Sequence, residues 1–330
     1  MMLRAMATGI GRRELMLALS GVALARPFAA HAQTYPTRPV TIQVGFAPGG
    51  PTDIAARLIG QWLSKRLGQP FIVENRPGAA TNIATEAVVR APADGYTLLA
   101  AVSTNTMNPA LYPTLGFNFI RDIAMVAGVH RSPLVLVVNP AVPVTSVPEL
   151  IAYAKANPGK ITLASFGSGT ISHVAGELFK MTADIDMLHV PYRGAAPMVT
   201  DLLAGQVEAA VDNLPASISH IRSGKLRALA VMSATRSPTL PEIPTLAEFQ
   251  PGFEASAWVG IGAPRRTAVE IIDKLNREIN AGLADPGIAA RTADLGATVF
   301  VGSPAELDRM VVEQTEKWAK VIQAAKLRIE

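Results

Sequence analysis

The sequence has 330 residues, of which 49% are hydrophobic and 17% charged, a composition typical of two packed domains and not of a fibrous or disordered chain. The formal net charge of +4 falls to +1 without residues 1–32, which contain four arginines and one glutamate. No run of Lys and Arg remains that could neutralise phosphates, so nucleic acid is excluded as a partner. The absence of cysteine excludes disulfides, thiolate catalysis and zinc-thiolate sites.

The first 32 residues have the order of a secretory signal peptide. Positive charge at Arg12-Arg13 precedes an apolar run of eleven residues from Leu15 to Ala25, and Ala30-His31-Ala32 supplies the small residues of a cleavage site. A membrane-spanning helix would need about 20 apolar residues. We therefore expect cleavage after Ala32 and a periplasmic protein. Paired arginines also occur in twin-arginine signals, so both export routes stay open.

After the signal, short β-rich runs alternate with helical patterns, which predicts an α/β fold. Strands are expected at 40–44, 71–73, 97–102, 134–138, 161–164, 187–190, 207–211, 226–231 and 255–261. Helices are expected at 51–67, 81–89, 146–157, from 171 onward, and at 197–203, 267–283 and 304–326. In the first helix Ile54, Leu58 and Trp62 recur every four residues with Ile59 and Leu63 beside them, so we expect this apolar face to pack on the sheet.

The most informative motif lies between the first strand and the first helix, and reads Phe46-Ala47-Pro48-Gly49-Gly50-Pro51-Thr52-Asp53. The glycine pair lets the backbone approach a ligand, and Pro51 suits the first helical position. A helix N-terminus offers unpaired amides and a positive dipole end, which favour an anion such as a carboxylate. Pro51 stands where a phosphate loop needs lysine, so nucleotide is not expected. A tight turn without a ligand remains the alternative.

A second loop of this kind is Ser165-Phe166-Gly167-Ser168-Gly169-Thr170, again between a strand and a helix. Two such loops can hold a carboxylate from both sides. The second loop lacks the third glycine of a dinucleotide-binding motif and the flanking glycines of a nucleophile elbow around Ser168. His173 follows in the first helical turn. It can support the loop or, in an exported hydrolase, act as a base near Ser168.

Two aspartates have open roles. Asp53 is the third helical residue, where an acidic side chain complements the helix dipole; its functional alternative is to bind a hydroxyl or amino group of the ligand. Asp212 ends the strand 207–211, where ligands of open α/β sheets lie, and a turn-forming role is the alternative. No histidines have metal-ligand spacing. We expect no metal and no cofactor.

Several further segments keep the order and spacing of one family along the chain from Tyr35 to the C-terminus. They are Phe46–Asp53, Val73–Gly78, Ala93–Leu98, Asn108–Tyr112, Gly167–Thr170 with His173, Val190–Gly194 and Asp201–Gly205. In these segments the chain resembles the tripartite tricarboxylate transporter substrate-binding family, also called the Bordetella uptake gene (Bug) proteins. The resemblance implies a type II, Venus-flytrap periplasmic binding protein with two lobes and two hinge crossovers. Its lobes would comprise 33–134 plus 252–330, and 135–251.

The resemblance also implies a carboxylate held between the two loops by backbone amides, hydroxyls and ordered waters. The residues it implicates are Ala47, Gly49, Gly50, Thr52 and Asp53 in the first loop, and Ser168, Gly169 and Thr170 in the second. The expected protein is a monomeric, non-enzymatic binder of a small carboxylate that serves the membrane permease subunits of a tripartite transporter. An exported α/β hydrolase and a ligand-presenting partner of a sensor kinase remain alternatives. The aromatic content of 5% disfavours a stacked aromatic ligand, which a single ring in the site would overturn.

Overall fold

The computed structural model describes residues 35–112, 114–324 and 326–327. The expected signal peptide and its cleavage site after Ala32 lie outside the described residues. The chain from Arg38 onward forms one compact unit, and a separate unit ends at Thr37. Every helix and strand described below belongs to the unit that begins at Arg38.

A mixed sheet with the strand order β2-β1-β3-β9-β4-β7-β5-β6 runs through this unit, and β8 and β10 also pair with β4. The strands are β1 Val40–Val44, β2 Phe71–Asn75, β3 Thr97–Val102, β4 Ile123–Val138, β5 Thr162–Ser165, β6 Leu188–Pro191, β7 Ala209–Asn213, β8 Arg227–Val231, β9 Ser256–Pro264 and β10 Thr298–Val299. β1 is parallel to β2 and β3, and β5 is parallel to β6 and β7. Parallel strands joined through helices confirm the α/β fold.

One long strand, β4, is shared by two halves of the sheet. Up to Pro133 it pairs with β9, whereas from Leu134 onward it pairs with β7 and β8. We call β1, β2, β3, β9 and β10 the first half, and β5 to β8 the second half. The chain therefore enters the second half along β4 and returns from β8 to β9.

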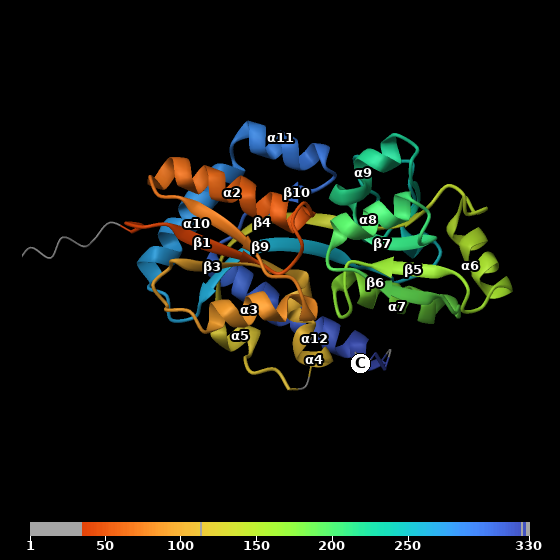
Figure 1. Cartoon of the computed structure of the whole chain (residues 1–330), viewed down its shortest axis with the longest axis horizontal. Helices are drawn as coiled ribbons and strands as arrows, with labels where there is room; N and C mark the ends of the chain where they lie inside the picture. The colour runs from red at the N-terminus through yellow and green to blue at the C-terminus, as the bar shows by residue number, and fades with distance from the viewer. Residues whose placement is uncertain (1–34, 113, 325, 328–330) are drawn as a thin grey trace, which may run out of the picture. The chain divides into compact units, whose positions relative to one another are not determined.

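Helices cover both faces of each half (Figure 1). In the first half α2, α10 and α11 lie on one face, and α3, α5 and α12 lie on the other. In the second half α8 and α9 lie on one face and α7 on the other. The helices are α2 Pro51–Leu67, α3 Asn82–Val89, α4 Asn108–Leu111, α5 Phe119–Asp122, α6 Val147–Ala156, α7 Ile171–Ala183, α8 Ala195–Leu203, α9 Leu214–Arg222, α10 Val269–Leu283, α11 Pro286–Asp294 and α12 Pro304–Ala324, with 3₁₀ turns at Ala79–Thr81, Ser103–Thr106 and Leu246–Glu248.

Buried apolar side chains form a larger and a smaller cluster. The larger one surrounds β4, β5 and β7 and includes Leu136, Phe179 and Met198, all fully buried. A smaller one joins α3 and α12 to the first half through Met125 and Val311, among others. Removal of this apolar surface from water is the main term that stabilises each half.

The apolar face expected on α2 is buried in part. Ile59 and Leu63 are fully buried, together with small residues, whereas Ile54 is 39% exposed. Gly60 explains the choice, because a Cβ at this position would lie 3.1 Å from the Phe71 carbonyl oxygen of β2. The helix approaches the sheet along its small residues together with Ile59 and Leu63, whereas Ile54 faces elsewhere.

The sequence prediction missed some helices and gave one strand too short. The expected strand 134–138 is only the end of β4, whose earlier residues are almost all buried and so lack the alternation that marks a strand. The helices α9 and α11 were not expected. A local signal for α11 exists, because Asp285 caps it by accepting from the Gly287 and Ile288 amides, with Pro286 next.

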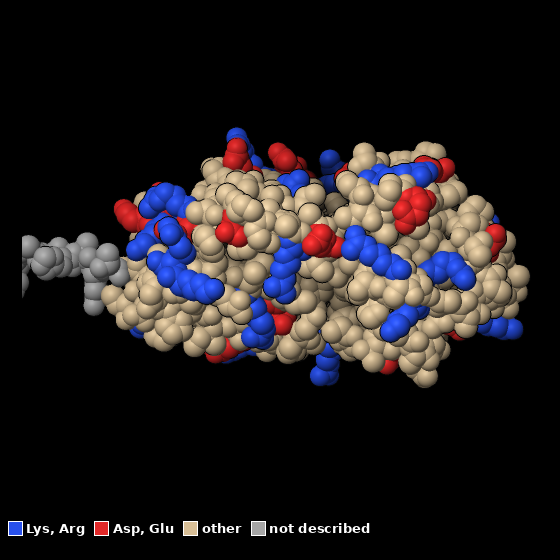
Figure 2. All heavy atoms as spheres, turned by 90° about the horizontal axis from the view of Figure 1, so that it is seen from above, with Lys and Arg blue, Asp and Glu red and all other residues tan. Residues whose placement is uncertain are grey.

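Within the described residues, no helix is long and apolar enough to cross a membrane. The same residues contain no cluster of three or more His, Cys, Asp or Glu that could hold a metal ion. Positive and negative side chains are interspersed over the face seen in Figure 2, and neither sign gathers into one large patch.

Candidate functional site

The two predicted loops meet at one cavity of about 520 Å³. The first loop contributes Gly45 and Phe46, and the second contributes Gly167, Ser168 and Thr170. Phe166 of the second loop also lines the cavity. The other lining residues are Pro191 at the end of β6 with Tyr192 and Arg193 after it, Tyr112 after α4, and the segment after β2, Gly78, Ala79, Ala80 and Thr81. No aspartate or glutamate lines the cavity, and Arg193 is its one basic lining residue among those described.

In the first loop, Gly49 adopts φ +85°, a left-handed conformation that favours glycine. Its amide donates to Asp53 Oδ2 at 3.0 Å. Gly50 begins α2 as its N-cap residue without a side-chain cap. The Ala47 amide donates to the Arg193 carbonyl oxygen at 3.0 Å. The amides of Gly49 and Ala47 are therefore engaged within the protein in this conformation.

Asp53 is 3% exposed and lies at the centre of a hydrogen-bond network. Its Oδ1 accepts from Asn75 Nδ2 and pairs with Arg57 Nη2, both at 2.9 Å. Its Oδ2 accepts from the Gly49 amide and from Arg57 Nε at 3.0 Å. Burial alone would raise the pKa of Asp53, but these hydrogen bonds outweigh it and hold the pKa below the ordinary value of 3.8. Asp53 fixes the shape of the first loop.

The second loop is held by uncharged groups. Thr170 caps α7 by accepting from the His173 amide, and its hydroxyl donates to the Gly167 carbonyl oxygen at 2.7 Å. The Gly169 amide donates to His173 Nδ1 at 3.0 Å. Ser168, between these residues, is half-buried and lines the cavity.

Two histidines stack beneath the second loop. The rings of His173 and His189 are 3.9 Å apart and nearly parallel. Ser165 Oγ lies 2.7 Å from His189 Nε2. Burial lowers the pKa of both imidazoles to about 4, so both are neutral at pH 7. His173 Nδ1 accepts the Gly169 amide, and so it is not placed as a base toward the Ser168 hydroxyl.

Thr52 and Asp212 lie away from the cavity. Thr52 is buried and borders a small interior cavity of about 10 Å³, together with Asn213. Asp212 is fully buried, and its carboxylate accepts from Ser217 Oγ at 2.5 Å and from the Asn213 amide at 2.8 Å. Burial raises the pKa of Asp212 to about 7 despite these hydrogen bonds. Both oxygens of Asp212 hold the start of α9.

Sequence reasoning missed the segment after β2. Ala79, Ala80 and Thr81 have φ of 45°, 48° and 71°, which for residues other than glycine costs about 1–2 kcal/mol each. Buried amides hold them there: Asn108 Nδ2 donates to the Ala80 carbonyl oxygen at 2.9 Å and Asn105 Nδ2 to Thr81 Oγ1 at 3.0 Å. Strain of this kind gathers at ligand-binding loops. The sequence of this segment, small residues after a glycine, has no local pattern that predicts left-handed backbone conformations.

Gly45 explains how this strained segment reaches the first loop. A Cβ on Gly45 would lie 2.5 Å from Thr81 Cβ and 2.8 Å from Thr81 Cα. Only glycine leaves room for the strained segment there.

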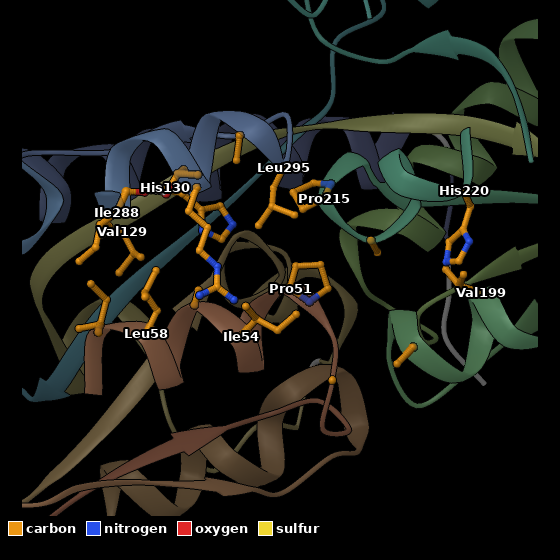
Figure 3. Close-up of a pocket in the computed structure, with 18 of the residues that line it drawn as sticks. Pro51, Ile54, Leu58, Val129, His130, Val199, Pro215, His220, Ile288 and Leu295 are labelled. Carbon is orange, nitrogen blue, oxygen red and sulfur yellow. Dashed lines mark hydrogen bonds between the residues drawn. The ribbon is translucent and has the colours of Figure 1, made fainter. Parts of the chain in front are cut away.

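A second cavity, of about 390 Å³, lies between α2 and α11 on one side and α8 and α9 on the other (Figure 3). Of the predicted site residues it includes Gly49 alone. Phe46 and Arg193 line the first cavity, whereas Gly49 and Ala196 line the second. Ala47 lies between Phe46 and Gly49 in the chain, and its amide donates to the carbonyl oxygen of Arg193. This hydrogen bond therefore joins the two chain segments that border both cavities.

Comparison with known proteins places these features in a family. The family described as "Tripartite tricarboxylate transporter family receptor" matches residues 55–327. Protein BugT of Bordetella pertussis is 39% identical over 321 residues, which cover 95% of this chain and 98% of BugT.

Two solved structures share the fold. The structure of R. palustris Rpa4515 with adipate has a TM-score of 0.86 and 38% identity, and covers 89% of this chain and 100% of that chain. The periplasmic binding protein BugD has a TM-score of 0.86 and 36% identity, with coverage of 89% and 100%. The two-lobed periplasmic-binding-protein fold is therefore confirmed.

The family consists of solute receptors, so the expectation of a protein that is not an enzyme is confirmed, and the hydrolase alternative is set aside. The homologues are periplasmic, which gives this chain the same location. The chain belongs to the tripartite tricarboxylate transporter receptor family, the family of the Bug proteins, and is a periplasmic solute-binding protein.

Proposed function

We propose that this protein captures a small carboxylate in the 520 Å³ cavity and delivers it to the permease subunits of a tripartite transporter. The observation that carries the proposal is the meeting of two βα loops at one cavity that lacks acidic side chains and has Arg193 at its edge. An anion gains from such a site through helix N-termini, hydroxyls and a nearby cation. The adipate bound to Rpa4515 supports the same ligand class.

Within this proposal the predicted residues take different roles. Ser168 before α7 and Gly50 at the start of α2 present donors toward the carboxylate. Ala47, Gly49, Thr52, Asp53, Gly169, Thr170 and Asp212 act through the shape of the loops, because their polar groups are buried or engaged. Lobe closure would bring the two sets together around the ligand.

The lobe boundaries are part of the proposal. We propose lobes at 33–134 plus 252–330 and at 135–251. The change of β4 from β9 to β7 and β8 between Pro133 and Leu134 supports the first boundary. The return of the chain between Val231 of β8 and Ser256 of β9 supports the second. We also propose that the protein acts as a monomer.

The shape of the cavity bears on the ligand. Four aromatic residues line it, and the rings of Phe46 and Phe166 meet edge to face with centroids 5.8 Å apart. The low overall aromatic content is therefore a poor guide to this site. A carboxylate with an apolar body fits such a lining better than a compact polyanion.

The test is thermal unfolding of the full chain, stripped of ligand by unfolding and refolding, with aliphatic and aromatic carboxylates and their uncharged amides. At 100 times its dissociation constant a ligand adds about 2.7 kcal/mol, or roughly 5 to 10 °C. We expect a shift with one carboxylate and none with its amide. Ser168→Trp, which fills the cavity, should abolish the shift, whereas Ser219→Trp on the exposed side of α9 should keep it. A shift that survives Ser168→Trp would refute this site.

Delivery needs a separate test, because a partner of a sensor kinase would bind the same ligand. Deletion of the gene should abolish uptake of the identified carboxylate into cells. Uptake that continues unchanged, with loss of a transcriptional response to the carboxylate, would favour the sensor instead.

A further inference from the structure

The 390 Å³ cavity has the dimensions of a ligand site and lies apart from the proposed one. Pockets for small molecules occupy about 300–1,000 Å³. The residues that line this cavity come from α2, β4, α8, α9, α11 and the chain beside them. It therefore touches elements that belong to the first half of the sheet and elements that belong to the second.

The lining is mainly apolar. Ile54 and Leu58 of α2 face this cavity in place of the sheet, opposite Val199 of α8 (Figure 3). Ile288 and Leu295 close the side formed by α11 and the turn after it. This arrangement gives a reason for the apolar stripe on α2, which the packing of the sheet leaves unexplained. An apolar ligand body would remove these side chains from water.

The polar groups of the cavity are basic or neutral. Arg291, His130 and His220 line it, and no aspartate or glutamate does among the residues that the structure describes. Arg291 is exposed and has no ion-pair partner among the described residues. His130 is 9% exposed, lies at the cavity in Figure 3, and makes no hydrogen bond through its ring within the part of the chain that the structure describes. Burial lowers the pKa of His130 to about 4, so Arg291 supplies the positive charge at pH 7.

We propose that this cavity is a second ligand site, which binds an amphipathic monocarboxylate with its apolar body against α2, α8 and α11 and its carboxylate at Arg291. A single cation in an apolar enclosure selects one anionic group and a hydrophobic body. Such a ligand contacts both halves of the sheet. The described polar link between α9 and α11 is a hydrogen bond from Arg222 Nη1 to the Asp294 carbonyl oxygen, at 3.1 Å. The bound ligand adds to this link and opposes separation of the halves.

The test is calorimetric titration of the full chain with octanoate and with octanamide, its uncharged analogue. Octanoate should bind with a stoichiometry of about one, and Arg291→Gln should weaken it about tenfold, as expected for loss of a charge-assisted contact, without changing the affinity for octanamide. Arg277→Gln, an exposed arginine of α10 outside the cavity, is the matched control. Thr200→Trp and Ala216→Trp should each abolish binding of both compounds by filling the cavity.

The variant Ser168→Trp separates this site from the proposed carboxylate site. Octanoate binding that persists in Ser168→Trp and disappears in Thr200→Trp supports the second site. Octanoate binding that disappears in Ser168→Trp and persists in both cavity-filling variants overturns it, because the ligand would then occupy the first cavity. Absence of octanoate binding to the wild-type chain, or equal affinity in Arg291→Gln, also overturns the proposal. Thr200 is exposed, so its variant tests the site even where Ala216→Trp disturbs folding.

Discussion

The two loops that meet at the proposed carboxylate site begin their helices in similar ways but are held by different chemistry. The first loop folds around the buried, charged Asp53 and leads into α2 without a side-chain cap. The second is capped by Thr170 and fixed by the neutral ring of His173. Two loops at equivalent positions in the two halves can thus be held in different ways, one by a charged carboxylate and the other by neutral side chains. Four changes separate these two mechanisms.

The largest effect is expected from Asp53→Ala. This change removes the acceptor of the Gly49 amide and one of the acceptors of Asn75 and of Arg57. We expect a loss of about 3 kcal/mol in the free energy of unfolding. The matched control is Glu86→Ala in α3, which removes another carboxylate paired with an arginine four residues later, but on the surface. It should cost less than about 0.5 kcal/mol. Similar losses in urea unfolding for both variants would show that Asp53 does not hold the loop.

Acidification from pH 7 to pH 5 should weaken the second loop and spare the first. Below pH 6.5 the unfolded chain protonates each histidine, whereas His173 and His189 in the folded chain stay neutral down to about pH 4. The unfolded state then binds more protons than the folded state. The free energy of unfolding therefore decreases as the pH is lowered, by about 1–2 kcal/mol for each of the two histidines. Asp53 is ionised in both states throughout this range, because its folded pKa lies below 3.8. Hydrogen exchange at the two loops measures the difference.

The double variant His173→Gln, His189→Gln provides the control for this pH effect. Its unfolding free energy should depend less on pH between 7 and 5 than that of the wild type. Two other buried groups contribute in both proteins: His130, whose pKa is lowered to about 4, adds to the loss of stability, whereas Asp212, whose pKa is raised to about 7, takes up a proton in the folded state and opposes it. An unchanged slope in the double variant would mean that the stacked pair titrates at ordinary values.

The ease with which each feature could be predicted follows from how local its signal is. The glycine pair before α2 and the loop residues before α7 lie within a few residues of the helices they precede, and both helices begin where the sequence predicted. The two loops were therefore found from sequence. The stack of His173 on His189 depends on the register of β5 and β6, and no local pattern indicates it.

Which face of a helix packs on the sheet was harder to predict than where the helices and strands lie. Apolar spacing in α2 predicted one face with Ile54, Ile59 and Leu63. Ile59 and Leu63 are buried beside the small residues, where Gly60 allows a close approach to β2, whereas Ile54 is exposed. Asp53 illustrates the same limit. Its place in the first turn of α2 suggested that it complements the helix dipole. Its partner Asn75 lies in β2, 22 residues later in the chain, and reaches Asp53 only in the folded protein.

A smaller effect is expected from Thr170→Ala, which removes the cap of α7 and the hydrogen bond to the Gly167 carbonyl. The loss should be about 1 kcal/mol. Thr170→Ser keeps the hydroxyl and should restore most of it. Chemical unfolding of both variants separates the cap from the packing of the threonine methyl group. A serine variant as unstable as the alanine variant would assign the effect to packing.

The smallest effect is expected from adding to α2 the cap that it lacks, through Gly50→Ser. The backbone at Gly50 is extended (φ −82°, ψ 169°), and a Cβ there would have its nearest neighbours at 3.9 and 4.0 Å, so serine fits without strain. A serine hydroxyl can accept from the free amides of the first turn, which should stabilise the fold by a few tenths of a kcal/mol. The same hydroxyl would compete with a bound anion for those amides. We therefore expect higher stability together with weaker carboxylate binding, and stability gained without loss of affinity would place the carboxylate away from the start of α2.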